Sequence, residues 1–228
     1  MISVIIPVYN TAKWLPKCLD SVLKQDFRNI EVILVNDGST DKSLSVCKRY
    51  ATKDKRIILI DKLKNEGVEL ARQSGYAIAR GEYIMYIDSD DWLDHPQVIS
   101  TMYRKAEDTG ADYVEIGIQR VLDRHKWFVK KSVVARLGVI DQPELFDKYY
   151  LSFFGVNILS VNVWGKLYRK FVLDKADIEP VGVFMGEDLA YSIRLFPYLK
   201  RIYILNEIGY NYRMGGEQDD ITLIYCPI

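Results

Sequence analysis

The stretch "YIMYIDSDDW", residues 83–92, runs from five apolar or aromatic residues straight into a segment with three aspartates. An unbroken apolar run is typical of a strand that is covered on both faces, as the parallel strands of α/β proteins are. Three carboxylates at the end of a buried strand therefore need a reason. The stretch alone leaves three open: a solvated turn, a cap for the following helix, or a metal site.

The same succession of apolar run, polar turn and helix continues through the first 120 residues. Strands are predicted at 3–8, 30–35, 56–60, 82–87 and 112–118, alternating with helices at 13–25, 41–51, 68–79 and 95–109. This alternation predicts right-handed crossovers and an α/β fold with a doubly wound, mostly parallel mixed sheet flanked by helices. After residue 120 the pattern loosens, with a helix predicted from Glu187 and a last strand at 202–205. We interpret 1–120 and 121–228 as two halves of one compact domain.

The overall composition excludes several classes of function. The 228 residues include 31 Lys and Arg and 31 Asp and Glu, so the net charge is zero and gives no support to a nucleic-acid partner. The three cysteines show no paired spacing, which favours a reducing, cytoplasmic compartment. With two histidines a His-rich zinc site cannot be built, so any metal would be held by oxygen ligands.

Polar residues follow the predicted strands, at the carboxyl edge where ligands of open α/β sheets bind. Tyr9 follows the first strand, Asp37 the second and the acidic cluster the fourth. Together these residues suggest a ligand with a flat, hydrogen-bonding base and with phosphates that carry a bound cation. A rim that is merely solvated would also be polar. In extended backbone Asp88 and Asp90 would project to one side, where Mg²⁺ would relieve their repulsion, and Asp91 would cap the next helix. Alternatively, all three aspartates cap that helix.

These motifs together resemble the family 2 glycosyltransferases, which are inverting, nucleotide-sugar-dependent enzymes with the glycosyltransferase A-type fold. The matching stretches are "VIIPVYN", "EVILVNDGSTD", "NEGVELARQSGYAIARGEYIMYIDSDDW" and, later, "GED", in the family's order and spacing. Beyond residue 120 the match is thinner and rests also on "VWGKLYRK" and "YNYR". Gln73 departs from the family, which usually has Asn there. Many relatives continue past this endpoint, as expected if the chain is truncated at the C-terminus.

The resemblance implies that residues 1–120 are the nucleotide-sugar-binding half of the domain and residues 121–228 the acceptor-binding half. Pro7 and Tyr9 would form the platform for the base, with Tyr9 stacking on uracil, and Asp37 would accept a base N–H. Arg72 would reach the base or the phosphates. Each assignment has a plainer alternative: Tyr9 packs beneath its loop, Asp37 supports a turn in "DGS", and Arg72 is a surface arginine.

The resemblance extends this site to the cation. Asn65 would belong to the nucleotide site and, with Gly67, shape the turn before the helix at 68–79, Gly67 for the sake of backbone geometry. Asp88 would hold the ribose or support the cation. Asp90 would bind the metal, Mn²⁺ or Mg²⁺, directly.

The resemblance also implies a catalytic base, Asp188 of "GED", which would take the proton of the acceptor hydroxyl. Glu187 and Asp188 would point about 100° apart on a helix, so one of them faces the cleft. The alternative is that both simply favour a helix N-terminus. Four further residues are interpreted as lining the acceptor or diphosphate side: Trp164, Lys166, Tyr212 and Arg213.

The expected partners are a nucleotide-sugar donor, most simply a UDP-sugar, and a glycan or lipid-linked sugar acceptor in surface polysaccharide or glycan synthesis. The basic stretch 120–136 is a solvated face or, as a hypothesis, a peripheral contact with anionic lipid. A NAD-dependent dehydrogenase is disfavoured because the first strand leads into no G-x-G-x-x-G. A phosphatase that uses "DSD" is disfavoured because it leaves Tyr9, Asp37 and the "NEG…AR" segment unused. An inactive module that binds nucleotide or sugar stays open.

Overall fold

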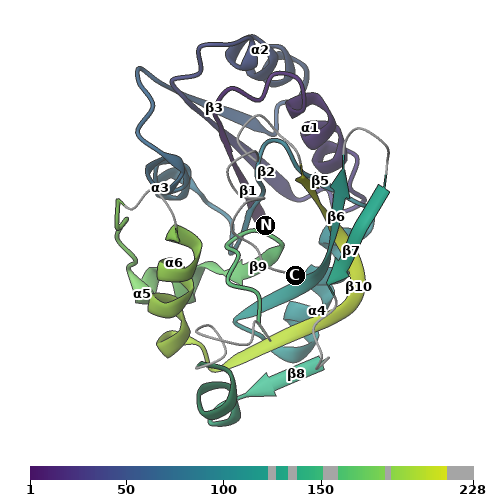
Figure 1. The fold of residues 1–228 in the computed structure, drawn as a ribbon, viewed down its shortest axis with the longest axis vertical. Coiled ribbons are helices and arrows are strands. Elements are labelled where there is room, and N and C mark those ends of the chain that lie inside the picture. Colours follow the sequence, from purple (N-terminus) through teal and green to yellow (C-terminus); the bar gives the residue numbers. More distant parts are fainter. Residues whose placement is uncertain (123–126, 133–137, 151–158, 183–185, 215–228) are drawn as a thin grey trace.

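A single mixed sheet of ten strands organises the chain, whose computed structural model describes residues 1–122, 127–132, 138–150, 159–182 and 186–214. The strand order is β3-β2-β1-β4-β9-β6-β10-β5, with β7 paired to β6 and β8 to β10 (Figure 1). The longer ladders, β1 with β2, β2 with β3 and β6 with β10, are parallel. The predicted α/β class, a mostly parallel mixed sheet flanked by helices, is confirmed. The strands are β1 (Ile2–Val8), β2 (Ile30–Asp37), β3 (Ile57–Lys62), β4 (Tyr83–Tyr86), β5 (Trp92–Leu93), β6 (Tyr113–Leu122), β7 (Trp127–Ser132), β8 (Gly138–Asp141), β9 (Lys166–Arg169) and β10 (Arg201–Met214).

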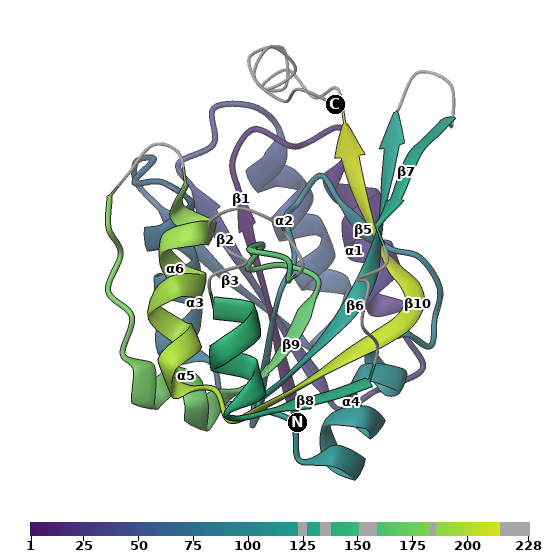
Figure 2. The same ribbon diagram turned by 60° about the horizontal axis from the view of Figure 1, so that its bottom comes forward.

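Helices cover both faces of this sheet. The helices α1 (Leu15–Leu23), α2 (Ser43–Lys53) and α4 (Val98–Thr109) bury their apolar side chains in one core. The helices α3 (Val68–Ile78), α5 (Lys170–Ala176) and α6 (Glu187–Leu195) bury theirs in a second core and lie together in Figure 2. This arrangement places α3 and the start of α6 near each other, although more than a hundred residues separate them.

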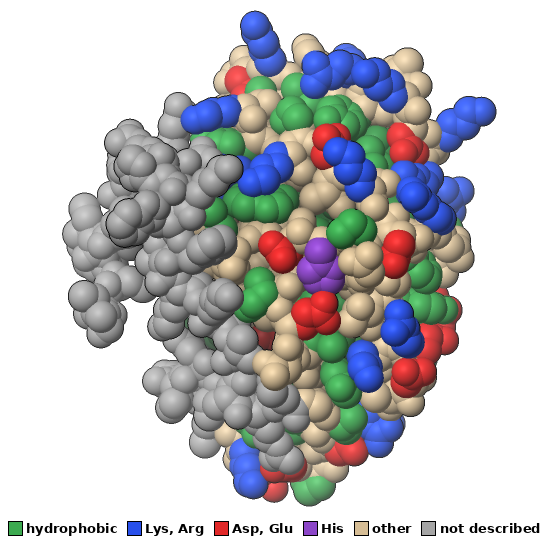
Figure 3. Space-filling model, turned by 90° about the vertical axis from the view of Figure 1, so that its right-hand side faces the viewer, with side chains coloured by type: hydrophobic (Ala, Val, Ile, Leu, Met, Phe, Trp, Pro, Cys, Tyr) green, Lys and Arg blue, Asp and Glu red, His purple; other side chains and the backbone are tan. Residues whose placement is uncertain are grey.

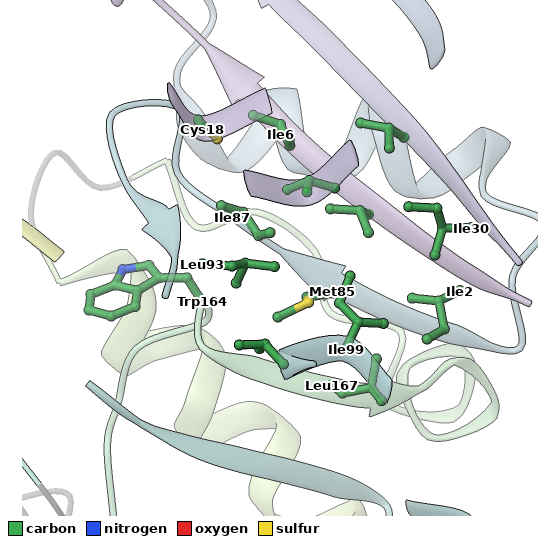
Figure 4. Packing of buried hydrophobic residues seen from close by; sticks show 14 of the residues in the cluster. Ile2, Ile6, Cys18, Ile30, Met85, Ile87, Leu93, Ile99, Trp164 and Leu167 are labelled. Carbon is green, nitrogen blue, oxygen red and sulfur yellow. The ribbon is translucent and has the colours of Figure 1, made fainter. Parts of the chain in front are cut away.

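Strand β1 shows why the sequence reads as unbroken apolar runs. Ile2, Val4 and Ile6 pack into the core on the α1 side, whereas Ile5 packs into the core on the α3 side. Both faces of the strand are covered, so no position faces water. Figure 4 shows the first of these cores, with Trp164 at its margin.

The structure departs from the sequence prediction at short or bulged strands. Residues Trp92 and Leu93 form β5 by pairing with Asn211 and Tyr210, so α4 begins at Val98 and not at residue 95. The last strand, predicted at 202–205, continues to Met214 across two register shifts. A strand as short as the two-residue β5 has too few positions to show an apolar pattern of its own. The unpredicted β9 lies at the centre of the sheet, between β4 and β6.

No helix in the ranges that the structure describes is both long and apolar enough to cross a bilayer.

Candidate functional site

The carboxyl ends of β1, β2 and β4 meet at one edge of the sheet. The parallel register sets Val8 opposite Asn36, and Ile87 donates its N–H to the carbonyl of Ile5 at 3.1 Å. The loops that follow are joined by hydrogen bonds, among them Thr11 Oγ1 to Ser89 Oγ at 2.9 Å. The three predicted polar strand ends therefore form one continuous rim.

The first loop carries the predicted platform for a base. Pro7 is buried within β1 opposite Val35, and Tyr9, immediately beyond the strand, is half-buried. Tyr9 is therefore partly accessible at the rim, whereas Pro7 is enclosed within the strand. Stacking of Tyr9 on a nucleobase stays a prediction.

Asp37 holds the turn that precedes α3. Its buried carboxylate accepts hydrogen bonds from the backbone N–H groups of Glu66 at 3.1 Å and Gly67 at 2.8 Å, and it pairs with Lys62 Nζ at 3.3 Å. Gly67 adopts φ +95°, which a side chain would strain, so its predicted backbone role is confirmed. Asn65 Oδ1 accepts from the same Gly67 N–H at 2.9 Å. Asp37 thus supports a neighbouring loop and not a turn within its own "DGS".

Arg72 joins two carboxylates from opposite ends of the chain. Its Nη2 lies 3.0 Å from Asp88 Oδ1, after β4, and its Nη1 lies 2.8 Å from Asp188 Oδ1, in the first turn of α6. The arginine side chain is 9% exposed, which rules out the surface-arginine alternative. The predicted donor-side aspartate and the predicted base are therefore held on one guanidinium.

Burial and the charges of neighbouring side chains shift the pKa values of Arg72 and of the carboxylates around it. Burial by itself would lower the pKa of Arg72, but Asp88 and Asp188 outweigh it, and the pKa of the guanidinium is raised. Burial raises the pKa of Asp88, against the opposing effect of Arg72 and with a smaller contribution from Asp188. Burial likewise raises the pKa of Glu187, next to Asp188. The Arg72 guanidinium thus pairs with two carboxylates, those of Asp88 and Asp188, that would otherwise repel each other.

The acidic cluster forms a tight turn, which corrects two expectations. The N–H of Asp91 donates to the carbonyl of Asp88 at 3.1 Å, so the extended backbone expected to align Asp88 with Asp90 is absent. Asp91 is buried and accepts hydrogen bonds from the N–H of Arg213 at 2.7 Å and Tyr210 OH at 2.8 Å. It does not cap α4, whose N-cap position is Gln97. Burial and the neighbouring aspartates raise the pKa of Asp91.

The carboxylates at the rim fit a cation that arrives with a diphosphate. Within the described ranges no three His, Cys, Asp or Glu side chains are grouped as a metal site. Asp91 accepts hydrogen bonds from β10, one oxygen of Asp88 contacts Arg72, and Asp90, the predicted ligand, is half-buried. Mg²⁺ is usually held by one or two carboxylates together with substrate phosphates, and this donor set is compatible with that mode. Metal binding by Asp90 stays a prediction.

Strand β10 supplies residues that secure the acidic turn. Arg213 Nε donates to the carbonyl of Asp90 at 2.8 Å, and its guanidinium lies 5.0 Å from the centre of the Trp92 ring. Tyr210, which the sequence reasoning passed over, donates to Asp91 and accepts from the N–H of Asp88 at 3.2 Å. Its position within "YNYR" was the available signal.

The residues predicted on the acceptor side fall into two groups. Trp164 stacks on Tyr212 with ring centroids 5.2 Å apart, near the turn that Arg213 secures. Lys166 is buried, and its Nζ donates to the carbonyls of Ser160 and Asn162. Lys166 therefore fixes a loop below the rim and does not line the cleft.

Of the basic stretch 120–136, the structure describes residues 120–122 and the backbone of 127–132, and the rest lies outside the described residues. Figure 3 shows a face of the molecule on which basic and acidic side chains are interspersed beside the atoms left grey. The proposed contact with anionic lipid therefore stays a hypothesis.

Comparisons with known proteins bear on this site. The sequence matches the family described as "Glycosyl transferase family 2" over residues 3–176. It is 32% identical over 216 residues to "Glycosyltransferase GlyA" of Streptococcus pneumoniae serotype 4, covering 93% of this chain and 30% of that protein. The chain therefore spans about a third of that relative.

Two solved structures share the fold. S. aureus TarS 1–349 in complex with UDP-GlcNAc superimposes with a TM-score of 0.81 at 22% identity, covering 100% of this chain and 61% of that one. The mannosyltransferase PcManGT from Pyrobaculum calidifontis, in complex with GDP-Man and Mn²⁺, has a TM-score of 0.70 at 18% identity, covering 98% of this chain and 59% of that one.

Proposed function

Since the chain belongs to glycosyl transferase family 2, we propose that it transfers a sugar, with inversion, from a nucleotide-diphosphate sugar to an acceptor hydroxyl. The observation that carries the proposal is the Arg72 bridge, because it brings the donor-side Asp88 and the predicted base Asp188 to one point. We propose a UDP-sugar as donor, in line with the UDP-GlcNAc complex of TarS. The acceptor would be a glycan or a lipid-linked sugar in surface polysaccharide synthesis.

In the proposed reaction Asp188 acts as general base. It takes the proton of the acceptor hydroxyl while that oxygen bonds to the anomeric carbon, from the face opposite the leaving diphosphate. The bond between the anomeric carbon and the diphosphate oxygen breaks, and its electron pair leaves with the nucleotide. General base catalysis of this kind contributes roughly 10²–10⁴-fold in rate. Arg72 would serve by holding Asp188 in place through its 2.8 Å contact.

The donor would lie along the rim described above. Tyr9 would stack on the base, Asp37 and Asn65 would fix the loop that borders it, and Asp88 would face the ribose. Asp90 would hold Mn²⁺ or Mg²⁺. The complex of PcManGT with GDP-Man and Mn²⁺ supports the proposal that a protein of this fold binds a divalent metal ion. A bound cation would neutralise charge that develops on the departing diphosphate.

Exchanging one carboxylate on α6 tests the assignment. We expect UDP-sugars, among UDP-, GDP- and TDP-sugars tested with Mn²⁺ or Mg²⁺, to raise the melting temperature by binding the native state. Asp188→Asn should keep donor binding and lose at least about 10²-fold in transfer rate. Glu187→Gln, one position away, is the matched control and should retain most activity. Normal transfer by Asp188→Asn would show that the base is another residue, and donor binding without any turnover would favour the inactive module.

A further inference from the structure

Four carbonyl groups in a row, those of an irregular stretch at residues 160–163, accept hydrogen bonds from side chains. The donors are Lys166 Nζ to Ser160 at 2.6 Å, Ser192 Oγ to Val161 at 2.6 Å, Lys166 Nζ to Asn162 at 2.5 Å and Tyr168 OH to Val163 at 3.0 Å. Backbone outside helices and sheets lacks the regular partners of a ladder, so its carbonyls need other donors. The conformation of this stretch, which we call the 160–163 segment, therefore depends on three side chains.

Lys166 supplies two of these four bonds from within the sheet. It is the first residue of β9 and lies opposite Glu115 of β6, with its Nζ 3.8 Å from Glu115 Oε2 and each side chain 3% exposed. Tyr168, two residues further along β9, projects from the same face and packs into the core that α3, α5 and α6 cover. Burial lowers the pKa of Lys166, and the charges of Glu115 and Asp188 oppose this shift. The ammonium group therefore lies on the side of the sheet that faces α6.

Ser192 connects the 160–163 segment to α6. It lies four residues after Asp188, so the two side chains project from the same face of the helix, about one turn apart. Ser192 is buried, and its hydroxyl donates to the carbonyl of Val161. The helix that carries the predicted base is therefore attached by hydrogen bonds at two levels, through Asp188 to Arg72 and through Ser192 to the segment.

The second attachment matters because general base catalysis depends closely on position. A base must lie within about 2.6–3.2 Å of the proton that it takes, and a displacement of about 1 Å can cost about 10²-fold in rate. The contact with Arg72 fixes one point near the start of α6, and the apolar packing of the helix is not directional. A second hydrogen bond, one turn further along, fixes the rotation of the helix about that point.

The residues that follow the 160–163 segment have attachments of their own. Trp164 stacks on Tyr212, and the carbonyl of Gly165 accepts a hydrogen bond from the N–H of Ile116 at 3.1 Å. The acidic turn of the donor rim is secured separately, by hydrogen bonds from β10. Loss of the side-chain donors should therefore loosen the segment and α6 and leave the donor rim in place.

We propose that Lys166 and Ser192 are positioning residues for the base, an inference that rests on the proposed function. Lys166 holds the 160–163 segment against the sheet, and Ser192 holds α6 against that segment. Asp188 thereby keeps its place relative to the donor rim. Neither positioning side chain touches the reacting atoms, so the loss of either should lower turnover without weakening the binding of the nucleotide.

Donor hydrolysis, with water in place of the acceptor, tests the role of Ser192. The readouts are the release of UDP from saturating UDP-glucose, UDP-galactose or UDP-GlcNAc in Mn²⁺, and the affinity for UDP in calorimetry. Ser192→Ala removes the hydroxyl, and alanine favours a helix more than serine does. We expect its kcat to fall at least about tenfold, with UDP affinity within about twofold of the wild type. Ser192→Thr keeps a hydroxyl and should recover most of the loss.

Ser74→Ala is the matched control for this substitution. Ser74 also lies on a helix, α3, but its Oγ donates within that helix, to the carbonyl of Leu70 at 2.7 Å. Its removal breaks no bond between elements, so Ser74→Ala should release UDP at the wild-type rate.

A double variant separates the hydrogen bonds of Lys166 from its charge. Lys166→Met alone also leaves Glu115 buried without its cation, which by itself destabilises the fold. Lys166→Met combined with Glu115→Gln removes both charges and should melt at a higher temperature than Lys166→Met. Its kcat should nevertheless stay at least about tenfold below the wild type, because two carbonyls of the 160–163 segment still lack their donor. If the double variant does not fold, Ser192→Ala decides.

Hydrogen exchange, followed by mass spectrometry, reports on α6 without turnover. Backbone amides of α6 should exchange at least about tenfold faster in Ser192→Ala and in the double variant, and those of β1 and β2 should not change. Faster exchange in α6 together with lower kcat and unchanged UDP affinity supports the inference.

Three results overturn the inference. The first is unchanged exchange in α6, and the second is wild-type kcat in the variants, which would show that Ser192 is dispensable and that Lys166 only neutralises Glu115. The third is a loss of UDP affinity as large as the loss of turnover, because the residues would then act on the donor rim. A wild-type protein that releases UDP from none of the three donors argues against the proposed function itself, and the exchange data then still decide whether the two side chains hold α6.

Discussion

Replacing Arg72 by Met removes the guanidinium that Asp88 and Asp188 share. Removing one partner of a buried ion pair costs about 3–5 kcal/mol, because an uncompensated charge is left behind. The side chains of Asp88 and Asp188 keep 27% and 20% of their surface exposed, so water relieves part of that cost. We therefore expect the free energy of unfolding to fall by about 3 kcal/mol, at the lower end of the range. For a chain of this size that corresponds to a drop in melting temperature of about 6–12 °C.

Urea unfolding near neutral pH measures this change, and a second substitution tests its cause. Arg72→Met combined with Asp188→Asn carries one buried charge fewer than Arg72→Met alone. The double variant should therefore be more stable than the single one, although it contains one more substitution. The reasoning fails if Arg72→Met lies within about 0.5 kcal/mol of the wild type. It also fails if the double variant is no more stable than Arg72→Met.

Three further predictions concern the sheet and the donor rim. Burial by itself would raise the pKa of Glu31, but hydrogen bonds from Ser3 and Arg80 outweigh it and hold the pKa below its ordinary value. This stabilisation is present above the ordinary pKa of a glutamate and is lost as pH falls through the lowered pKa. Glu31→Gln should therefore cost about 1–2 kcal/mol at neutral pH, and its difference from the wild type should shrink as pH falls through that lowered pKa. A difference that stays constant with pH in urea unfolding would contradict this. Tyr9→Ala should weaken UDP binding at least about fivefold, since stacking is worth about 1–3 kcal/mol per base, whereas Tyr9→Phe should bind normally in calorimetry. Asp90→Ala should bind UDP in the presence of Mn²⁺ only as tightly as the wild type does without metal, and its affinity without metal should be unchanged. If Mn²⁺ still raises the UDP affinity of this variant, Asp90 is excluded as the metal ligand.

The first half of the fold could be predicted because its strands read as apolar runs and its helices have a clear period. Ile2 to Val8 reads as one apolar run since both of its faces are covered, and the amphipathic helices follow at regular spacing. The two-residue β5 and four-residue β9 have no such signal. Their places depend on partners in β10, β4 and β6 that lie far away in sequence.

That the polar strand ends share one edge of the sheet could be predicted, but the contacts between their side chains could not. The polar strand ends meet at one edge because parallel register requires it. The Arg72–Asp188 contact spans 116 positions, and neither spacing nor periodicity encodes such a pair. Asp91 was misassigned for a related reason: capping is a local rule, and the hydrogen bonds from Tyr210 and Arg213 come from a strand about 120 residues later.

The central place of β9 has a consequence for how the chain folds as it is synthesised. When residue 122 has left the ribosome, β1 to β4 can pair, but the outer edge of β4 has no neighbour until Lys166–Arg169 arrive and insert between β4 and β6. For more than forty residues of elongation, the nascent sheet therefore carries an open edge, the feature through which strands of different chains join and aggregate. Strand β4 is only four residues long, and an edge this short limits that hazard. Late insertion of a central strand also makes the sheet close in a single non-local step, which favours slow, all-or-none folding of the two halves together.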